Sequence, residues 1–480
     1  MACIVFPARI GAKVTIPSIL GSNMVLQRND RASIWGKASP GAKVNVTTSW
    51  DARTYSAKAD KDGNWLVKVT TGDAGGPYTI TINDGESITL DNVLLGEVWV
   101  CGGQSNMEMR VQGFMHQPVN GALETILEAP RHPQMRFFTV ERAVSDTLMD
   151  NCGGSWLESS PESVANFSAC AYFFGKELND MLDVPIGLIT TNWAGTAIEP
   201  WIDKPTFESI DDIDKAIALK RAEAYPEQAP ASLYNAMVNP ITNYTAKGFI
   251  WYQGESNRGY ADDYVKLLTA LIKSWREKWS DVDMPFYMVQ LAPYPYGNKN
   301  GFTLPLLIEA QYKVASRLPK VAIAATTDIG SPVCIHPPHK KEVGQRLAML
   351  ALQNDYGVEG LPLPAPTFKS MEIDGNKVTL DFNNLASHPN RWNANSFQIF
   401  ADTEYIRPAG FEIAGDDQIF YPAKGTFKDA KTTIEIFSDS VPNPVAVRYY
   451  FHNYVPDANV RTCLGQPLVP FRTDNWAVNE

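Results

Sequence analysis

Three apolar segments of this chain each end in a turn of small and polar residues, and this repeated pattern restricts the fold more than any other feature. The three turns read Gly-Gly-Gln-Ser-Asn-Met at 102–107, Trp-Ala-Gly-Thr at 193–196 and Gln-Gly-Glu-Ser-Asn at 253–257. Groups that follow successive parallel strands gather beyond the carboxyl edge of one sheet. The pattern therefore predicts a parallel sheet with a single site at that edge.

Strand and helix patterns alternate through the middle of the chain, from 93 to 356. Apolar residues recur at helical spacing in 171–178, 262–279, 306–318 and 339–353. Strands are expected between these helices, at 95–101, 186–191, 247–252, 286–291 and 321–327. Such alternation predicts an α/β domain with helices on both faces of its sheet.

Short strand patterns with turn residues flank this α/β domain on both sides. Residues 1–92 are typical of a β-sandwich-like domain, with a hairpin turn expected at 60–64, and residues 357–480 of a second β domain. A chain of 480 residues is also too long for one ordinary hydrophobic core. We therefore expect three domains, at 1–92, 93–356 and 357–480.

Composition and charge exclude several functional classes. The net charge of −11 argues against a nucleic-acid partner, and the chain lacks the apolar run of about 18 residues that a membrane span needs. The first residues lack the basic and apolar parts of a signal peptide. Six cysteines without a Cys-x-x-Cys pair argue against a zinc site, although Cys152 and Cys170 remain candidates for a disulfide. No metal or organic cofactor is expected.

The turn residues and one late histidine supply the groups that acyl transfer needs. Ser105 becomes a nucleophile only if a nearby base accepts its proton. His336 follows the expected strand at 321–327 through a short loop, which assigns it to the same edge of the sheet as Ser105. His339 is the competing base, but it is better explained as the start of the next helix.

The negative oxygen of a tetrahedral intermediate needs fixed N–H donors. The backbone N–H groups of Ser105 and Gly195 are the natural pair, because both follow expected strands. A side-chain amide completes the set. We favour Gln253 for this third donor, with Asn257 as the alternative.

Four sequence blocks and two flanking motifs resemble the sialate O-acetylesterase family of SGNH hydrolases. The blocks are Gly-Gln-Ser-Asn-Met at 103–107, Gly-Thr-Ala-Ile-Glu-Pro-Trp at 195–201, Trp-Tyr-Gln-Gly-Glu-Ser-Asn at 251–257 and Ile-His-Pro at 335–337. The flanking motifs are Asn-Met-Val-Leu-Gln-Arg at 23–28 and Pro-Phe-Arg-Thr-Asp-Asn-Trp at 470–476, so the resemblance covers nearly the whole chain.

This resemblance implies an SGNH-type, flavodoxin-like sheet and an esterase that removes acetyl groups from sugars, most plausibly O-acetylated sialic acids. Acetyl xylan esterases resemble the same core, so the family specifies the reaction better than the sugar. Related proteins are usually exported or lysosomal. We therefore expect a periplasmic or secreted protein, while a cytoplasmic location stays open.

The acid that orients the histidine departs from the common SGNH pattern. Many SGNH enzymes carry Asp two or three residues before the histidine, where this chain has Cys334 and Val333. We favour Glu255 as the third member, because related carbohydrate esterases use a glutamate, and we expect it to point at the imidazole, directly or through one water molecule. Asp328, eight residues before His336, is one alternative. A backbone carbonyl or a water molecule is the other, which would leave a Ser–His dyad.

Two functions from different classes remain. The first is a serine esterase that acts on acetylated sugars. The second is a carbohydrate-binding protein whose esterase core has decayed, which the missing acid before His336 would favour. Retention of the five residues named for catalysis favours the esterase: Ser105, Gly195, Gln253, Glu255 and His336.

Overall fold

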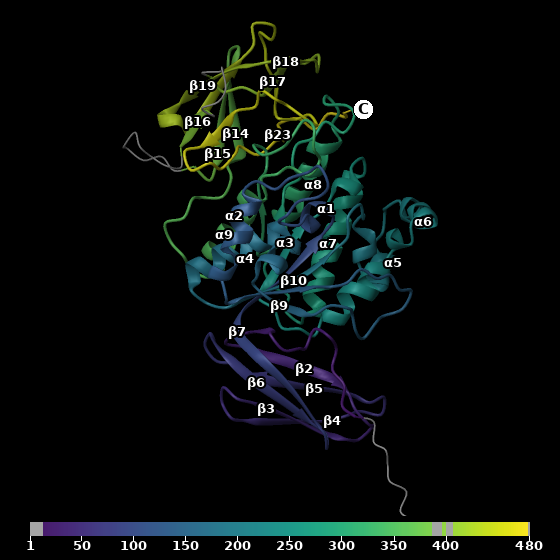
Figure 1. Ribbon diagram of the computed structural model, residues 1–480. Helices are drawn as coiled ribbons and strands as arrows, with labels where there is room; N and C mark the ends of the chain where they lie inside the picture. The colour runs from purple at the N-terminus through teal and green to yellow at the C-terminus, as the bar shows by residue number, and fades with distance from the viewer. Residues whose placement is uncertain (1–12, 386–395, 400–406, 479–480) are drawn as a thin grey trace, which may run out of the picture.

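The computed structural model describes residues 13–385, 396–399 and 407–478, so the first twelve residues, where we looked for a signal peptide, lie outside it. Three regions follow one another from one end of the molecule to the other (Figure 1). A β-rich region comes first, an α/β region lies in the middle, and a second β-rich region leads to the C-terminus.

The N-terminal region consists of two antiparallel sheets. One has the strand order β4 (Thr54–Lys58), β3 (Lys43–Thr48), β6 (Gly75–Asn83) and β7 (Ser87–Gly103). In the other, β2 (Arg31–Lys37) pairs with β5 (Asn64–Thr70), while β1 (Val25–Gln27) runs parallel to β7. The hairpin predicted at 60–64 is wrong, because β5 pairs with β2 rather than with β4. The turn at 60–64 instead carries the chain from the sheet of β4 to the sheet of β5. Alternate residues of β5 are buried, as expected for a strand with one face on the core.

Strand β7 is shared by the first two regions. Its first half pairs antiparallel with β6. Its second half pairs in parallel with β10 (Ile186–Asn192) on one side and with β11 (Gly248–Tyr252) on the other. The boundary predicted at residue 92 lies inside this strand, which runs on without a break.

The α/β region confirms the predicted fold class. Its sheet has the order β13 (Val321–Ala324), β12 (Phe286–Val289), β11, β7, β10, β8 (Met135–Thr139) and β9 (Trp156–Glu158), in which only the β8–β9 pair is antiparallel. The predicted helices correspond to α4 (Ala169–Leu182), α7 (Ala261–Lys278), α8 (Thr303–Ala315) and α9 (Lys340–Asn354). Shorter helices are α1 (Ser105–Glu108), α2 (Ala122–Glu128), α3 (Pro161–Asn166), α5 (Lys204–Ser209) and α6 (Lys215–Ala224).

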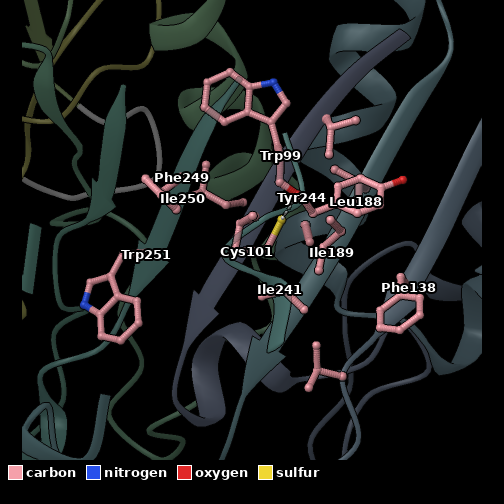
Figure 2. Close-up of a cluster of buried hydrophobic side chains, with 14 of the residues drawn as sticks. Trp99, Cys101, Phe138, Leu188, Ile189, Ile241, Tyr244, Phe249, Ile250 and Trp251 are labelled. Carbon is pink, nitrogen blue, oxygen red and sulfur yellow. Dashed lines mark hydrogen bonds between the residues drawn. The ribbon is translucent and has the colours of Figure 1, made fainter. Parts of the chain in front are cut away.

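Helices cover both faces of the central sheet. Trp99 of β7 packs against Phe174 of α4, with ring centroids 5.0 Å apart. Trp251 of β11 pairs with Gly102 of β7, which lies three residues after Trp99. Because side chains alternate along a strand, Trp251 points to the face opposite to Trp99, where it meets Trp275 of α7. Figure 2 shows this layer of buried side chains on β7, β10 and β11. Because both faces are covered, every residue of β10 is buried.

The C-terminal region has a core of its own. One antiparallel sheet contains β14 (Thr367–Asp374), β15 (Lys377–Asn383), β20 (Thr433–Phe437) and β19 (Lys424–Lys428). A second contains β18 (Phe420–Pro422), β17 (Phe411–Ala414), β21 (Ala446–Tyr449) and β23 (Phe471–Arg472), and β16 (Phe397–Ile399) pairs with β22 (Val460–Thr462). Fifteen buried apolar side chains from these strands and their loops form a cluster separate from the main core.

Two further observations concern the whole molecule. Cys152 and Cys170 are free, buried thiols, so the candidate disulfide is not formed. Cys170 instead donates to the backbone carbonyl of Asn106 at 3.5 Å. Within the described ranges, no helix is long and apolar enough to cross a membrane.

Candidate active site

The three predicted turns meet at one point because their strands end level with one another. Asn192 of β10 and Tyr252 of β11 both pair with Gly103, the last residue of β7. Gly103 has a φ of +146°, and an added Cβ would lie 2.2 Å from the carbonyl oxygen of Tyr252. Only glycine fits there. The chain then turns sharply into α1, whose first residue is Ser105.

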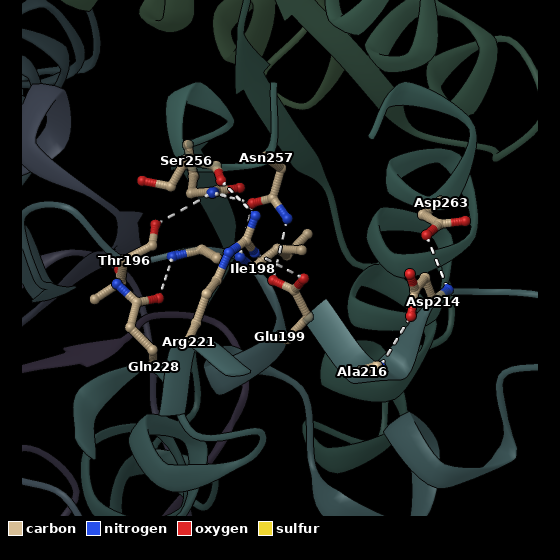
Figure 3. Close-up of polar contacts among 12 residues, drawn as sticks. Thr196, Ile198, Glu199, Asp214, Ala216, Arg221, Gln228, Ser256, Asn257 and Asp263 are labelled. Carbon is tan, nitrogen blue, oxygen red and sulfur yellow. Dashed lines mark hydrogen bonds and ion pairs between the residues drawn. The ribbon is translucent and has the colours of Figure 1, made fainter. Parts of the chain in front are cut away.

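The loop that carries Gly195 is held by side chains from three other segments. The backbone N–H of Ala194 donates to Glu108 Oε2 at 2.6 Å, which ties the loop to α1. The carbonyl of Gly195 accepts from Gln228 Nε2 and from Ser256 Oγ, each at 2.9 Å, and both donors appear in Figure 3. Gly195 itself has a φ of +79°, which favours glycine.

Two backbone donors at this point are free. Among the described residues, neither the N–H of Ser105 nor that of Gly195 has a hydrogen-bond partner. Gln253, the predicted third donor, is fully buried and uses both of its amide protons within the protein. They go to the carbonyl of Thr196 at 3.3 Å and to Asn257 Oδ1 at 2.8 Å. Gln253 therefore holds the loop beside Gly195 and has no proton left for an oxyanion.

Asn257, the alternative donor, is also part of this internal network. Its Oδ1 accepts from the backbone N–H of Ile198 at 3.0 Å, and its Nδ2 donates to Glu199 Oε2 at 3.1 Å (Figure 3). Glu199 in turn pairs with Arg221 at 3.1 Å. Asn257 is 1% exposed, so it supports the site from inside the protein.

A buried chain of charged and polar groups lies behind the serine. Lys340, at the start of α9, places Nζ 2.5 Å from Asn106 Oδ1, and Asn106 Nδ2 donates to Glu255 Oε1 at 2.6 Å. Burial raises the pKa of Glu255 and lowers that of Lys340. The direct contact predicted between Glu255 and the imidazole of His336 is not formed, since Glu255 Oε1 accepts from Asn106, next to the serine.

The late histidine lies beside this turn. Asn106 Nδ2 also donates to the carbonyl of Ile335 at 3.2 Å, which links the residue after Ser105 to the residue before His336. His336 Nδ1 lies 2.5 Å from Gln117 Oε1. Burial, with a smaller effect of Lys340, lowers the pKa of His336 to about 4.

Ser105 and His336 share no hydrogen bond in this structure. Among the described residues, the Ser105 hydroxyl has no hydrogen-bond partner, and its residue is 8% exposed. Catalytic hydrogen bonds are often long in unliganded enzymes and tighten when substrate binds.

The remaining candidates are engaged elsewhere. Both oxygens of Asp328 bind Arg346, each at 2.7 Å, so Asp328 does not orient the imidazole. His339 immediately precedes α9, as predicted, and its Nδ1 lies 3.1 Å from Glu342 Oε1. Neither residue contacts Ser105.

Sequence reasoning missed three residues of this site. Asn106 directly follows the nucleophile in the motif Gly-Gln-Ser-Asn-Met. This position could have marked it as a residue of the site. Lys340 and Lys341 look alike in sequence, yet Lys340 is fully buried and Lys341 is exposed. Gln117 stands in an irregular loop with no periodic pattern, so nothing in the sequence marked it.

Comparisons with known proteins identify the family to which this chain belongs. Residues 95–353 match the family described as carbohydrate esterase, sialic acid-specific acetylesterase. The chain belongs to this family. The matched segment begins in the second half of β7 and ends in α9, so it contains the whole central sheet apart from the N-terminal strands.

Individual relatives extend the match. Curated sialate O-acetylesterases from Mus musculus and Homo sapiens are each 29% identical. The mouse alignment covers 74% of this chain and 76% of the relative, and the human one covers 76% and 75%. The crystal structure of a carbohydrate acetylesterase from Xanthomonas citri superposes with a TM-score of 0.85 at 35% identity, covering 97% of this chain and all of that one. The protein is therefore a carbohydrate O-acetylesterase.

Proposed function

We propose that this esterase removes O-acetyl groups from sialic acids, with Ser105 as nucleophile and His336 as general base. The observation that carries the proposal is the link through Asn106, which joins the serine turn to the loop of His336. The Ser105 hydroxyl attacks the acetyl carbonyl carbon while His336 accepts its proton. The imidazolium then protonates the departing sugar oxygen. A water molecule, activated by the same imidazole, hydrolyses the acetyl-serine and releases acetate.

The backbone N–H groups of Ser105 and Gly195 would stabilise the negative oxygen of each tetrahedral intermediate. Both groups are unpaired within the described residues, and the Gly195 loop is held rigidly by Glu108 and Gln253. A fixed pair of donors is what an oxyanion hole requires, because the site then needs no rearrangement during the reaction.

A hollow next to the serine turn supports a sialic acid over a neutral sugar. It measures about 390 Å³, and its lining includes two arginines, Arg110 and Arg142, two carboxylates, Glu108 of α1 and Glu141, and Asn192 at the end of β10. Arg142 pairs with Glu108 and lies over the ring of Trp193. Arg110 is exposed and forms no ion pair within the described residues, so its guanidinium is available to a carboxylate.

Acetate release from matched substrates tests this proposal. O-acetylated sialic acids should be turned over faster than acetylated xylo-oligosaccharides. Arg110→Ala should lower kcat/KM for the sialic acid by about 10- to 100-fold more than for the xylo-oligosaccharide, because only the sialic acid loses a charged hydrogen bond. Arg131→Ala, which removes an arginine that is 78% exposed, is the matched control. A preference for the neutral substrate that Arg110→Ala leaves unchanged would favour an acetyl xylan esterase.

A further inference from the structure

The loop 113–120 contacts the imidazole of His336 in two ways. Gln117 Oε1 lies 2.5 Å from Nδ1. The ring of Phe114 meets the imidazole edge-on, with centroids 5.4 Å apart and planes at 80°. Neither residue belongs to the motifs that identified the family. The histidine is therefore held by a segment that those motifs do not include.

This loop has a closed and well-supported shape. Phe114 and Gln117 exchange two backbone hydrogen bonds of 3.0 Å. Gly113 has a φ of +84°, and an added Cβ would lie 2.4 Å from the carbonyl oxygen of Gln117. The backbone N–H of Asn120 donates to the carbonyl of Pro338 at 3.0 Å, two residues after His336. The side chain of Gln117 thus extends from a short turn that is itself anchored to the histidine loop.

No carboxylate among the described residues hydrogen-bonds this imidazole. The candidates are each engaged by another partner: Glu255 by Asn106, Asp328 by Arg346 and Glu342 by His339. Cys334, two residues before the histidine, donates to the carbonyl of His336 at 3.0 Å and does not contact its ring nitrogens. The place that an acid occupies in a serine triad is held here by a neutral amide.

We propose that Gln117 is the positioning residue for His336, an inference that rests on the mechanism proposed above. Its Oε1 accepts the proton of Nδ1–H, which leaves the lone pair on Nε2, the nitrogen that must accept the proton of Ser105. The ring of Phe114, packed nearly perpendicular to the imidazole, restricts its rotation. A neutral amide fills the same position in papain-like cysteine proteases, so the chemistry has a precedent on another fold.

A neutral partner also sets the protonation range of the base. A carboxylate beside the imidazole would favour its charged form and raise its pKa. Gln117 exerts no such effect, while burial and the positive charge of Lys340 lower the pKa of His336 to about 4. The arrangement keeps the base neutral, and therefore able to accept a proton, in acidic surroundings.

Two substitutions at position 117 test the inference. Gln117→Ala should lower kcat by about 10- to 100-fold with little change in KM, because the imidazole loses its fixed tautomer and orientation. Gln117→Glu should restore much of kcat at about pH 8, and it should move the acid limb of kcat/KM upward by about one pH unit or more. Gln112→Ala is the control, since Gln112 lies in the neighbouring segment and bonds Asn166, not the histidine.

A spectroscopic readout keeps the test independent of turnover. Long-range ¹H–¹⁵N spectra of histidine-labelled protein should show His336 protonated on Nδ1 in the wild type and a mixture of tautomers in Gln117→Ala. A wild-type His336 protonated on Nε2, or a Gln117→Ala enzyme within twofold of the wild-type kcat, would overturn the inference. Ser105→Ala and His336→Ala are measured alongside. If Ser105→Ala and His336→Ala retain turnover, the proposed mechanism fails. If both lose turnover while Gln117→Ala keeps it, the mechanism stands and only the role of Gln117 is refuted.

Discussion

Replacing Lys340 with methionine should weaken both stability and turnover. The substitution keeps most of the side-chain volume but removes the cation that faces Asn106 Oδ1. That amide oxygen, in a fully buried position, then loses its charged partner. Glu255 also loses one of the two positive charges, with Arg258, that favour its ionised form. Because Asn106 adjoins Ser105, any change in its orientation reaches the nucleophile.

The size of the effect follows from the chain of contacts. Two hydrogen bonds of 2.5 and 2.6 Å, joined by one amide, place the charges of Lys340 and Glu255 no more than about 7 Å apart. At an effective dielectric constant near 20, their attraction is about 2.4 kcal/mol. A charged hydrogen bond contributes about 1.5–3 kcal/mol more. The loss should therefore be about 4 kcal/mol, the range seen when one partner of a buried pair is removed.

A double-mutant cycle measures this coupling. Lys340→Met should lower Tm by roughly 5 °C, and its combination with Glu255→Gln should cost about 2 kcal/mol less than the sum of the single changes. Thermal and urea unfolding at neutral pH give the free energies, and p-nitrophenyl acetate hydrolysis gives turnover. Lys341→Met, at the neighbouring exposed lysine, is the control. Additive single effects, or a Lys340→Met protein as stable as the control, would refute the reasoning.

Two further predictions concern the catalytic groups directly. Ser105→Ala should reduce the rate of acetate release by about 10⁴- to 10⁶-fold at unchanged Tm, and retention of a tenth of wild-type activity would exclude Ser105 as the nucleophile. The wild-type kcat/KM should stay nearly constant from neutral pH to about pH 5 and should decrease at pH values below about 4. Only neutral His336 accepts the serine proton, and burial lowers its pKa to about 4. Initial rates in buffers of constant ionic strength measure this profile, and an acid limb near the ordinary histidine pKa would contradict it.

The sequence predicted the fold well because its signals are local. A strand such as β10, buried along its whole length, and a helix such as α7, with one apolar face, each show their environment in their own residues. The strand ends could then be aligned, which placed Ser105 and Gly195 at the same edge. The same reasoning misjudged the turn at 60–64, because the identity of a strand's partner depends on residues far along the chain.

The contacts within the site were harder to predict for the same reason. Gln117 and His336 are 219 positions apart, and Asn106 and Lys340 are 234 apart. Whether Glu255 turns to the histidine or to Asn106 depends on a lysine that becomes buried only when α9 docks against α4. In α9, Gly344 permits this docking, since an added Cβ would lie 2.5 Å from the Cβ of Phe173. Such side-chain choices follow tertiary packing and leave no mark in the motifs.

The continuity of β7 limits how this enzyme can be divided or recombined. Seventeen residues in one strand begin in the N-terminal β region and end two residues before Ser105. A gene fusion or proteolytic cut near residue 92 would split one continuous strand and separate its second half from β1, which pairs with residues 94–96. The N-terminal strands β1 and β6 therefore form one structural unit with the strand that leads to the nucleophile, and a chimera of two relatives with its crossover inside residues 87–103 should fold poorly.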